Sequence, residues 1–496
     1  MDSVAFGLVV LVTAVVGAAA VLSSRVSQRL RIPAPALFLI AASAAAEVWP
    51  SVGRLSSATV EHTVTLALAV ILFNGGAHMG WPRLRSAAGP VLWTGIAGTL
   101  LTAAGLAAVA HLALALEWRA AVLLGAALAP TDPAVVFSVL GRREITGRPG
   151  TLLEGESGAN DPVGIALLAA LLAEPVLGAG AAAHVAWELA AELVVGTAVG
   201  AAGGWALLVS MRRVRLPDEG LYPLRVLAGA LGIYGLAAVA HGSGFLAVFV
   251  AGVVVGGREA PFRREIARFN SSLASLAEIV AFTMLGLTIP LRSVADDWAW
   301  LAGLVLAAAL AVVIRPVVTG ALLWPARLPP GERLLVMWAG LKGAVPILLG
   351  VSIVASGVPD GRRLYEIIFV VVAFSVVVQG GTLPAVLRRL RIPLRTVEPE
   401  PWSLGVRLRH EPEGLHRFEV SPGSAADRLP VSDLQAAADA WVSLIIRDGR
   451  LVPVRADTVL QGGDEAVMIS GGRDAARLAS LFTEPVTEHK ELARVR

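Results

Sequence analysis

The sequence predicts an all-α polytopic membrane domain followed by a small α+β domain. Three observations support this fold class. Of the 496 residues, 56% are hydrophobic and only 16% are charged, whereas an ordinary soluble domain contains about 25% charged residues. The apolar residues occur in runs of about 20, the length that a helix needs to cross the hydrocarbon core of a membrane. After Arg395 these runs end and polar residues predominate.

The apolar runs predict thirteen transmembrane helices. The first follows Met1 without a basic leader and ends without a small-residue cleavage site, so we interpret it as a retained span rather than a signal peptide. A short span near residue 250 is preceded by Gly242 and Gly244, which predict a tight hairpin. The predicted spans are residues 4–22, 33–50, 60–78, 88–115, 120–139, 151–174, 182–210, 222–240, 244–257, 271–290, 299–323, 334–356 and 364–386.

The arginine residues predict the orientation of these spans, because loops that stay in the cytoplasm carry an excess of Lys and Arg. One set of alternate loops holds 21 arginines and the other set holds five, a bias that assigns the first set to the cytoplasm. The 21 are at positions 25, 29, 31, 83, 85, 142, 143, 148, 212, 213, 215, 258, 263, 264, 268, 327, 333, 388, 389, 391 and 395, and the five are at 54, 119, 292, 362 and 363. We therefore expect a multi-pass protein of the inner cell membrane with its N-terminus outside, its C-terminus in the cytoplasm and an odd number of spans.

The C-terminal part of the chain has the pattern of a small folded domain. In "WVSLIIRDGRLVPV" the pair Asp448-Gly449 separates two strand-like runs, which is a strong hairpin signal. "GDEAVMISG" predicts a further turn and strand, and "DAARLASLF" predicts a short closing helix. We expect a membrane domain over residues 1–395, a cytoplasmic α+β domain over 396–484 and a tail over 485–496. The predicted turns of the cytoplasmic domain fit a sensor of a small molecule or ion as well as an assembly module.

Several ionisable side chains fall deep inside the predicted spans. A charge at that depth costs about 3 kcal/mol on insertion scales, so such residues usually face a partner or a polar cavity. Glu47, Glu61 and His62 lie near predicted outer ends, and for these and for Glu188 and Glu192 an interfacial or capping role is the simpler interpretation. The deep residues are Asp132, Glu154, Glu156, Asp161, Glu278, Arg315 and Lys342.

Two of these residues lie where the sequence predicts broken helices. In "LAPTDPAVV" Pro130 and Pro133 flank Asp132, and two prolines three residues apart should unwind a helix. In "WAGLKGAVPILLG" glycines and Pro346 interrupt a second apolar span at Lys342. Either interruption alone could be a simple proline kink. Paired interruptions in two halves of a chain indicate the binding site of a secondary transporter built from inverted repeats.

The segment "EGESGANDPVG" predicts an oxygen-rich helix face. Glu154, Ser157 and Asp161 recur at intervals of three and four residues and therefore share one face, while Asn160 and Glu156 flank it. Oxygen ligands suit a hard alkali cation, and a carboxylate can also carry a proton. No cysteine or histidine accompanies them, which argues against zinc and other transition metals.

The runs "ILFNGG", "ALAPTDPAVV", "LLEGESGANDPVG" and "GLKGAVPI", in this order, resemble the monovalent cation:proton antiporter family, in its NhaP-type sodium/proton exchanger branch. The resemblance covers residues 1–395. The C-terminal segments "GSAADRL", "LIIRDG" and "GGDEAVMISG" resemble a TrkA-C-type regulatory domain of potassium channels and transporters.

The resemblance implies that Asp161 is the carboxylate that binds the cation and the proton in alternation. It places Asn160, Asp132, Thr131 and Ser157 around the ion, pairs Arg315 with Glu156 in a structural ion pair, and gives Lys342 and Glu154 supporting roles. It also implies a homodimer whose protomers have two crossed, broken helices and a separate dimerisation domain. Two positions depart from the family pattern, because Lys342 stands where Arg is common and Asn74 where Asp is frequent.

The expected function is therefore antiport of Na⁺ or K⁺ against H⁺, with a role in pH homeostasis. The resemblance implies an electroneutral cycle, since Asn160 rather than a second acid stands beside Asp161. Apart from the transported ions we expect no cofactor and no enzymatic activity. The expected partners are the lipid bilayer, a second copy of the chain and a ligand of the C-terminal domain, but not nucleic acid. A regulated cation channel and an intramembrane aspartyl protease using Asp132 and Asp161 are the alternatives. The C-terminal domain slightly favours potassium.

Overall fold

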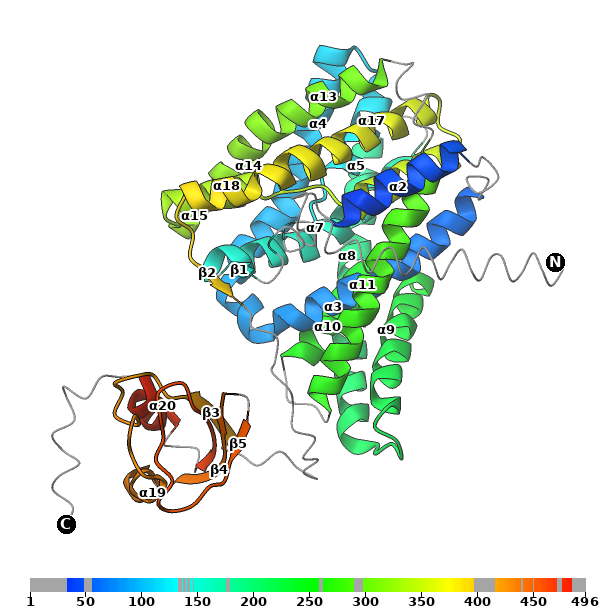
Figure 1. The fold of residues 1–496 in the computed structure, drawn as a ribbon. Coiled ribbons are helices and arrows are strands. Elements are labelled where there is room, and N and C mark those ends of the chain that lie inside the picture. The colour runs from blue at the N-terminus through cyan, green and yellow to red at the C-terminus, as the bar shows by residue number, and fades with distance from the viewer. Residues whose placement is uncertain are drawn as a thin grey trace. The chain divides into compact units, whose positions relative to one another are not determined.

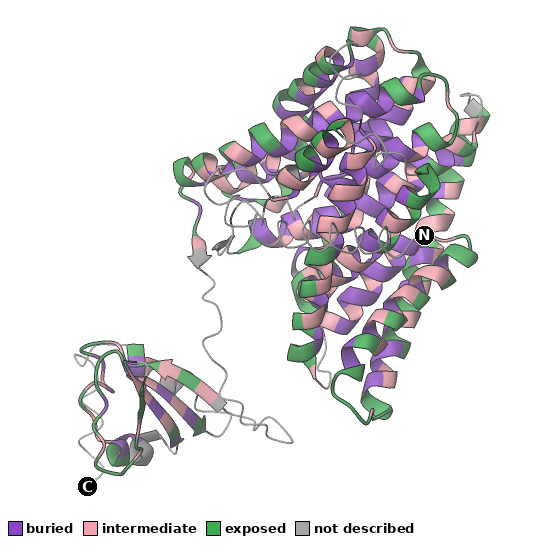
Figure 2. Ribbon diagram, turned by 45° about the vertical axis from the view of Figure 1, so that its right-hand side comes forward, coloured by how far each residue is buried: buried purple, intermediate pink, exposed green. Residues whose placement is uncertain are grey.

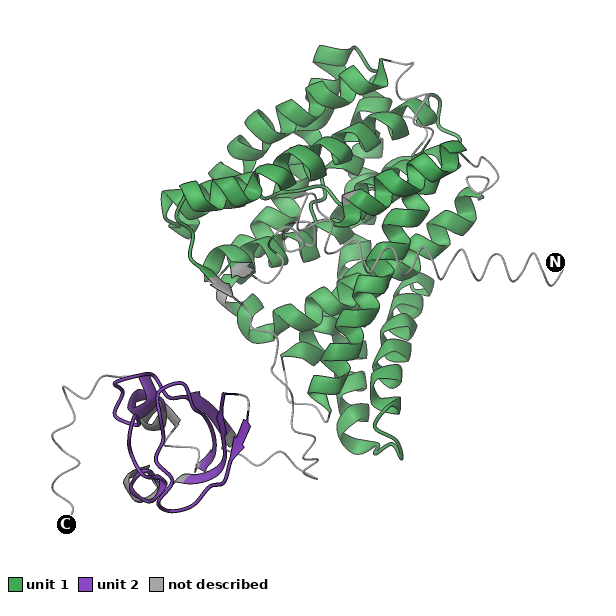
Figure 3. Cartoon of the chain, viewed as in Figure 1, with its two compact units in different colours: residues 1–398 green, residues 399–496 purple. Residues whose placement is uncertain are grey.

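The computed structural model divides the chain into two compact units, residues 1–398 and 399–496, which Figure 3 colours separately. The predicted domain boundary between residues 395 and 396 falls inside a short strand, β2 (Leu394–Thr396), near the end of the first unit. The residues that the structure describes are 34–48, 56–132, 136, 140, 143–145, 147–174, 179–257, 262–289, 298–396, 415–438, 440–448, 450–470 and 475–483.

The first unit is a bundle of helices (Figure 1). Within the described residues, seven helices are long and apolar enough to cross a membrane, and four shorter apolar helices accompany them. The predicted first span, residues 4–22, lies outside the described residues, so the predicted count of thirteen stays a prediction. The helices are α2 (Ala34–Val48), α3 (Ser57–Leu92), α4 (Gly98–Leu114), α5 (Trp118–Leu128), α7 (Arg148–Ala173), α8 (Ala179–Arg213), α9 (Leu221–Val239), α10 (Gly244–Gly256), α11 (Arg263–Leu287), α13 (Ala299–Ala309), α14 (Arg315–Leu322), α15 (Pro330–Trp338), α16 (Ala344–Ala355), α17 (Gly361–Phe374) and α18 (Gly381–Arg389).

The burial pattern is that of a membrane bundle. Buried residues fill the centre of the first unit in Figure 2, and its outer faces carry exposed residues. Many of the exposed side chains are large and apolar, including Trp187, Trp205, Val239 and Val312. Water would disfavour such a surface, whereas lipid tails match it. The first unit is therefore a multi-pass membrane domain.

Several helices are locally distorted. The predicted spans 60–78 and 88–115 are joined because α3 continues through a kink at Gly80, which has a φ of 59°. Three π-helical segments, η1 (Trp93–Ala97), η2 (Leu310–Ile314) and η4 (Ser375–Gly380), each continue directly into an α-helix. A short 3₁₀ turn, η3 (Trp324–Ala326), follows α14. π-helical turns often occur at functional sites, and η1 and η2 each lie in the span that precedes a predicted helix break.

The expectation of an all-α membrane domain is wrong at one place. Strand β1 (Arg143–Ile145) pairs antiparallel with β2, with Glu144 opposite Arg395. A strand of three residues is too short to show an alternating pattern, so the sequence gives no signal for it. The pairing ties the segment just before α7 to the segment that follows α18.

The second unit is a small α+β fold. Its four strands, β3 (Leu415–Glu419), β4 (Ala440–Arg447), β5 (Arg450–Val452) and β6 (Glu465–Ser470), form an antiparallel sheet in the order β3-β6-β4-β5. The predicted hairpin is confirmed, since β4 and β5 pair with Arg447 opposite Arg450. Helices α19 (Val431–Ala438) and α20 (Ala475–Thr483) contribute Leu434 and Phe482 to a core with Val442 and Met468.

An ion pair between the partly exposed Arg447 and the buried Asp464 joins β4 to the turn before β6. The Arg447 guanidinium donates two hydrogen bonds of 2.8 Å to Asp464, which also accepts the amide of Gln461. Burial alone would raise the pKa of Asp464, but these hydrogen bonds outweigh it and hold the pKa below its usual value of 3.8. The carboxylate therefore stabilises the fold of this unit in its charged form.

We expect Asp464→Ala to lower the free energy of unfolding of the second unit by about 2 kcal/mol, because hydrogen bonds to a charged group are lost. Because the folded-state pKa is lowered, the stabilisation is complete above pH 3.8 and is lost as the pH falls through the lower folded-state pKa. Amide hydrogen exchange of β4 and β6 in the full chain measures both effects. Asp457→Ala, an exposed aspartate in the same unit, is the control. Equal protection in the two variants would contradict the assignment.

Candidate cation site

The segment predicted to carry the oxygen-rich face forms one continuous helix, α7. Pro162 lies inside it and removes the amide that would donate to the carbonyl of Gly158. Glu156, Ser157, Asn160 and Asp161 are all buried, whereas Glu154, two turns before Asp161, is only partly buried. The carboxylates explain why α7 is absent from the seven strongly apolar helices, although it lies among them.

The first predicted helix break is present. Helix α5 ends at Leu128, and residues 129–132 are not helical. The Thr131 amide donates to Asn160 Oδ1 at 3.3 Å, and Asn160 Nδ2 donates to Thr131 Oγ1 at 2.7 Å. These two hydrogen bonds hold the interrupted backbone against the Asn-Asp pair of α7.

The second predicted break is also present and contacts the first. Helix α15 ends at Trp338, and α16 begins at Ala344. The Asp132 amide donates to the carbonyl of Leu341 at 2.8 Å. A Cβ on Gly343 would lie 1.9 Å from Oδ2 of Asp132, so only glycine lets the carboxylate approach this closely. Asp132 thereby sits at the N-terminus of α16, where the helix dipole favours a negative charge.

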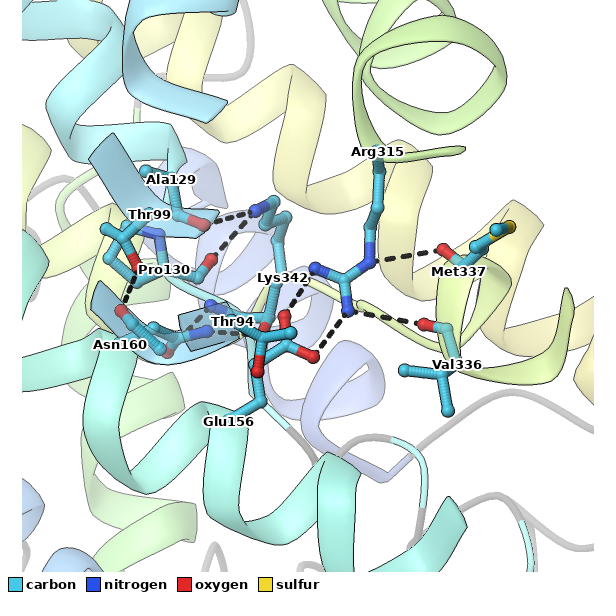
Figure 4. A network of polar contacts seen from close by, with 12 residues as sticks. Thr94, Thr99, Ala129, Pro130, Glu156, Asn160, Arg315, Val336, Met337 and Lys342 are labelled. Carbon is cyan, nitrogen blue, oxygen red and sulfur yellow. Dashed lines mark hydrogen bonds and ion pairs between the residues drawn. The ribbon is translucent and has the colours of Figure 1, made fainter. Parts of the chain in front are cut away.

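Lys342 is fully buried, and the acceptors recorded for its ammonium group among the described residues are backbone carbonyls. Its Nζ donates to the carbonyls of Ala129 and Pro130, each at 2.9 Å (Figure 4). These carbonyls follow the last residue of α5, so the ammonium satisfies free acceptors at the negative end of that helix. The partner that the sequence leaves open is therefore backbone. Sequence reasoning missed Ser375, whose hydroxyl accepts a hydrogen bond from the Lys342 amide at 3.0 Å and donates one to Gln379. The sequence signal for this contact was the spacing of Ser375 and Gln379, two polar residues four positions apart in an apolar span.

Arg315 and Glu156 form a bidentate ion pair with distances of 2.8 and 3.2 Å. The guanidinium also donates to the carbonyls of Met337 and Val336 near the end of α15, as Figure 4 shows. Both side chains are buried, so each charge depends on the other. The pair links α7, α14 and α15 and leaves no net charge in this part of the bundle.

Asp161 is one of the acids with a buried oxygen that lacks a recorded hydrogen bond. Its side chain is 5% exposed, yet Oδ1 has no hydrogen-bond partner among the residues that the structure describes. Asp132 and Lys342 lie within its electrostatic reach. The structure thus brings Asp161, Asn160, Thr131, Asp132 and Lys342 together around the two breaks, with Ser157 one turn away on α7. Such a group of oxygens can coordinate a hard monovalent cation, and a carboxylate among them can take a proton instead.

We expect Arg315→Ala to destabilise the protein by about 3 to 5 kcal/mol, because it leaves Glu156 buried without its counter-charge. Thermal unfolding of the purified protein in detergent measures the loss. The double variant Glu156→Gln, Arg315→Met should lose less stability than Arg315→Ala, since it leaves no buried charge without its partner. Arg333→Ala, which removes a less buried arginine stacked over Trp324, is the control. Wild-type stability in Arg315→Ala would show that the pair is not structural.

Comparison with known proteins places this geometry in a family. Residues 11–389 match the family model described as "Sodium/hydrogen exchanger, transmembrane". The K(+)/H(+) antiporter NhaP2 of Shewanella sp. (strain MR-4) is 30% identical over 511 residues, an alignment that covers 100% of this chain and 86% of the relative. The Na(+)/H(+) antiporter NhaH of Halobacillus aidingensis is 29% identical over 363 residues, covering 70% of this chain and 86% of the relative.

A solved structure has the same fold. The sodium proton antiporter MjNhaP1 from Methanocaldococcus jannaschii superposes with a TM-score of 0.63 at 22% identity, covering 77% of this chain and 99% of that chain. These relatives are transporters and not enzymes. The chain belongs to the sodium/hydrogen exchanger family of membrane cation/proton antiporters.

Proposed function

We propose that this protein exchanges an alkali cation for H⁺ by competition of the two ions for Asp161. The observation that carries the proposal is the buried Oδ1 of Asp161, which has no hydrogen-bond partner among the described residues. It lies next to Asn160, whose amide is fixed by Thr131 at a helix break. A carboxylate in this setting gains a partner either by binding a proton or by coordinating a cation.

The charges around Asp161 support a one-for-one cycle. Glu156 and Arg315 neutralise each other, and the single positive charge of Lys342 acts on Asp161, which also feels the negative charge of Asp132. When all three are ionised, Asp161, Asp132 and Lys342 carry one net negative charge, which either one cation or one proton neutralises. A neutral site crosses a low-dielectric barrier at lower cost than a charged one. We therefore propose an electroneutral exchange in which the site crosses the membrane barrier only when an ion or a proton neutralises it.

The ligands that we assign to the cation are oxygens from both sides of the contact between α7 and the first break. Asp161 and Asp132 supply carboxylates, Thr131 and Ser157 supply hydroxyls, and Asn160 supplies its amide oxygen. Because Thr131 and Asn160 are hydrogen-bonded to each other, their oxygens are oriented before the cation arrives. Glu154, at the less buried end of the same helix face, is proposed to attract cations toward this group.

The wider architecture belongs to the same proposal. We propose two inverted repeats with crossed broken helices, because η1 precedes the break after α5 as η2 precedes the break after α15. We further propose a homodimer in the inner membrane, with the N-terminus outside and the second unit in the cytoplasm as a TrkA-C-like regulatory module. K⁺ is the first cation to test, since the relative aligned over the whole chain is a K(+)/H(+) antiporter.

We expect Asp161→Asn to abolish cation-driven proton movement in proteoliposomes that contain a pH-sensitive dye. Asparagine keeps the size of the side chain but cannot exchange a proton, so the protein should remain folded with an unchanged elution volume. The matched control is Asp218→Asn, an exposed aspartate whose carboxylate accepts only the Gly220 amide in the recorded hydrogen bonds. Wild-type exchange by Asp161→Asn would refute the proposal.

We expect Gly343→Ala to raise the KM for the cation by about tenfold or more, equivalent to about 1.4 kcal/mol of lost binding. The added Cβ would displace the carboxylate of Asp132 from the start of α16. Gly235→Ala is the control, because a Cβ there would meet nothing within 4 Å. The KM of each protein is obtained from exchange rates measured as a function of cation concentration. A KM of Gly343→Ala equal to that of the wild type would show that Asp132 does not contribute to cation binding.

A further inference from the structure

We propose that Glu278, on helix α11, is a second cation-binding carboxylate, which holds the cation on its way between solution and Asp161. The inference rests on the proposed function and extends it to a helix outside the two broken segments. Of the deep ionisable residues in the sequence, Glu278 is the one for which the site around Asp161 gives no role.

Glu278 is directed into the protein. Its Oε1 is inaccessible to solvent and has no hydrogen-bond partner among the described residues. Its neighbours on the same side of α11, namely Ala277, Ala281 and Phe282, are all buried. A carboxylate that only anchored the helix at the membrane surface would keep its oxygens in water. An acid kept inside the bundle without a hydrogen bond at one oxygen indicates an ion or a proton as its partner.

The packing of α11 brings this carboxylate near the proposed site. Helix α11 packs against α3, along which it runs in Figure 1, and against α16. Asp132 lies at the N-terminus of that same α16, in contact with Gly343. The charge of Asp132 also acts electrostatically on Glu278. Asp132 is therefore within electrostatic range of both Asp161 and Glu278.

The two acids lie at similar distances from the starts of their helices. Helices α7 and α11 begin at Arg148 and Arg263, on the arginine-rich side of the membrane. Asp161 and Glu278 follow these starts by 13 and 15 residues. At about 1.5 Å per residue, both lie about 20 Å along their helices. Each acid thus lies well inside its helix, away from the helix start.

A third oxygen lies on the helix between them. Asn74 Oδ1 on α3 is likewise buried and has no hydrogen-bond partner among the described residues. A Cβ on Gly76 of α3 would meet the backbone carbonyl of Phe249 at 2.2 Å, and a Cβ on Gly158 of α7 would meet the ring of the same residue at 2.1 Å. Phe249 of α10 therefore packs against both the α3 turn that follows Asn74 and the α7 turn that precedes Asp161. Oxygens from α3, α7 and α11 that lack hydrogen bonds could each coordinate the same mobile cation in turn.

The test measures K⁺/H⁺ and Na⁺/H⁺ exchange by the full chain in proteoliposomes, as a function of cation concentration. We expect Glu278→Gln to raise the KM for the cation at least fivefold while the maximal rate stays within twofold of wild type. Glu278→Asp keeps a carboxylate but shortens the side chain, so it should raise the KM above the wild-type value and by less than Glu278→Gln does. Glu265→Gln is the matched control, since Glu265 is an exposed acid in the first turn of the same helix.

A purely structural role for Glu278 would lower the unfolding temperature of Glu278→Gln without changing KM, and this result would overturn the inference. An unchanged KM in a stable Glu278→Gln variant would overturn it as well. If Glu278→Gln does not fold, the KM of Glu278→Asp is the test. A shortened cation ligand must weaken binding, so an unchanged KM in Glu278→Asp would show that Glu278 is not a ligand. Failure of the proposed function would look different, because the wild type would then show no exchange or Asp161→Asn would retain it.

Discussion

The membrane domain depends on satisfying the backbone groups that two interrupted helices leave free. At membrane depth an unpaired carbonyl or amide costs several kcal/mol, so non-helical backbone persists only where protein supplies partners. Here Lys342 supplies two hydrogen bonds to the end of α5, and the Asp132 amide bonds to Leu341 in the opposite break. Each break thus completes the hydrogen bonding of the other. The recorded hydrogen bonds of Lys342 Nζ therefore go to backbone, and its charge acts on Asp161 through space.

The other buried charges are likewise fixed by hydrogen bonds. Arg315 is held by Glu156 and two carbonyls, so it too is fixed away from Asp161. Gly340 and Gly343 permit these arrangements, because a Cβ at either position would collide with Arg315 or Asp132. What remains is an acid with neither a direct ion pair in the described residues nor a hydrogen bond at Oδ1. An acid in that state can exchange ligands, whereas a paired acid cannot.

The sequence was informative where strong local chemistry determines structure. Proline and glycine at 130, 133, 343 and 346 predicted both breaks, and Asp448-Gly449 predicted the hairpin of the second unit. It was uninformative where structure depends on distant contacts. The acceptors of Lys342 are carbonyls more than 200 residues away, which no side-chain pattern encodes, and the β1–β2 ribbon is too short to show periodicity. The carboxylate of Asp161 could be picked out from sequence by its Asn-Asp pair, but its lack of a hydrogen bond required the packed structure.

The central claim is that a proton and an alkali cation compete for Asp161. The most direct measurement is the number of protons released when K⁺ or Na⁺ is added to the purified, weakly buffered protein in detergent. The account predicts release of about one proton per bound cation near the midpoint of the titration of Asp161, and no release by Asp161→Asn. Cation binding by the wild type without any release of protons would contradict it.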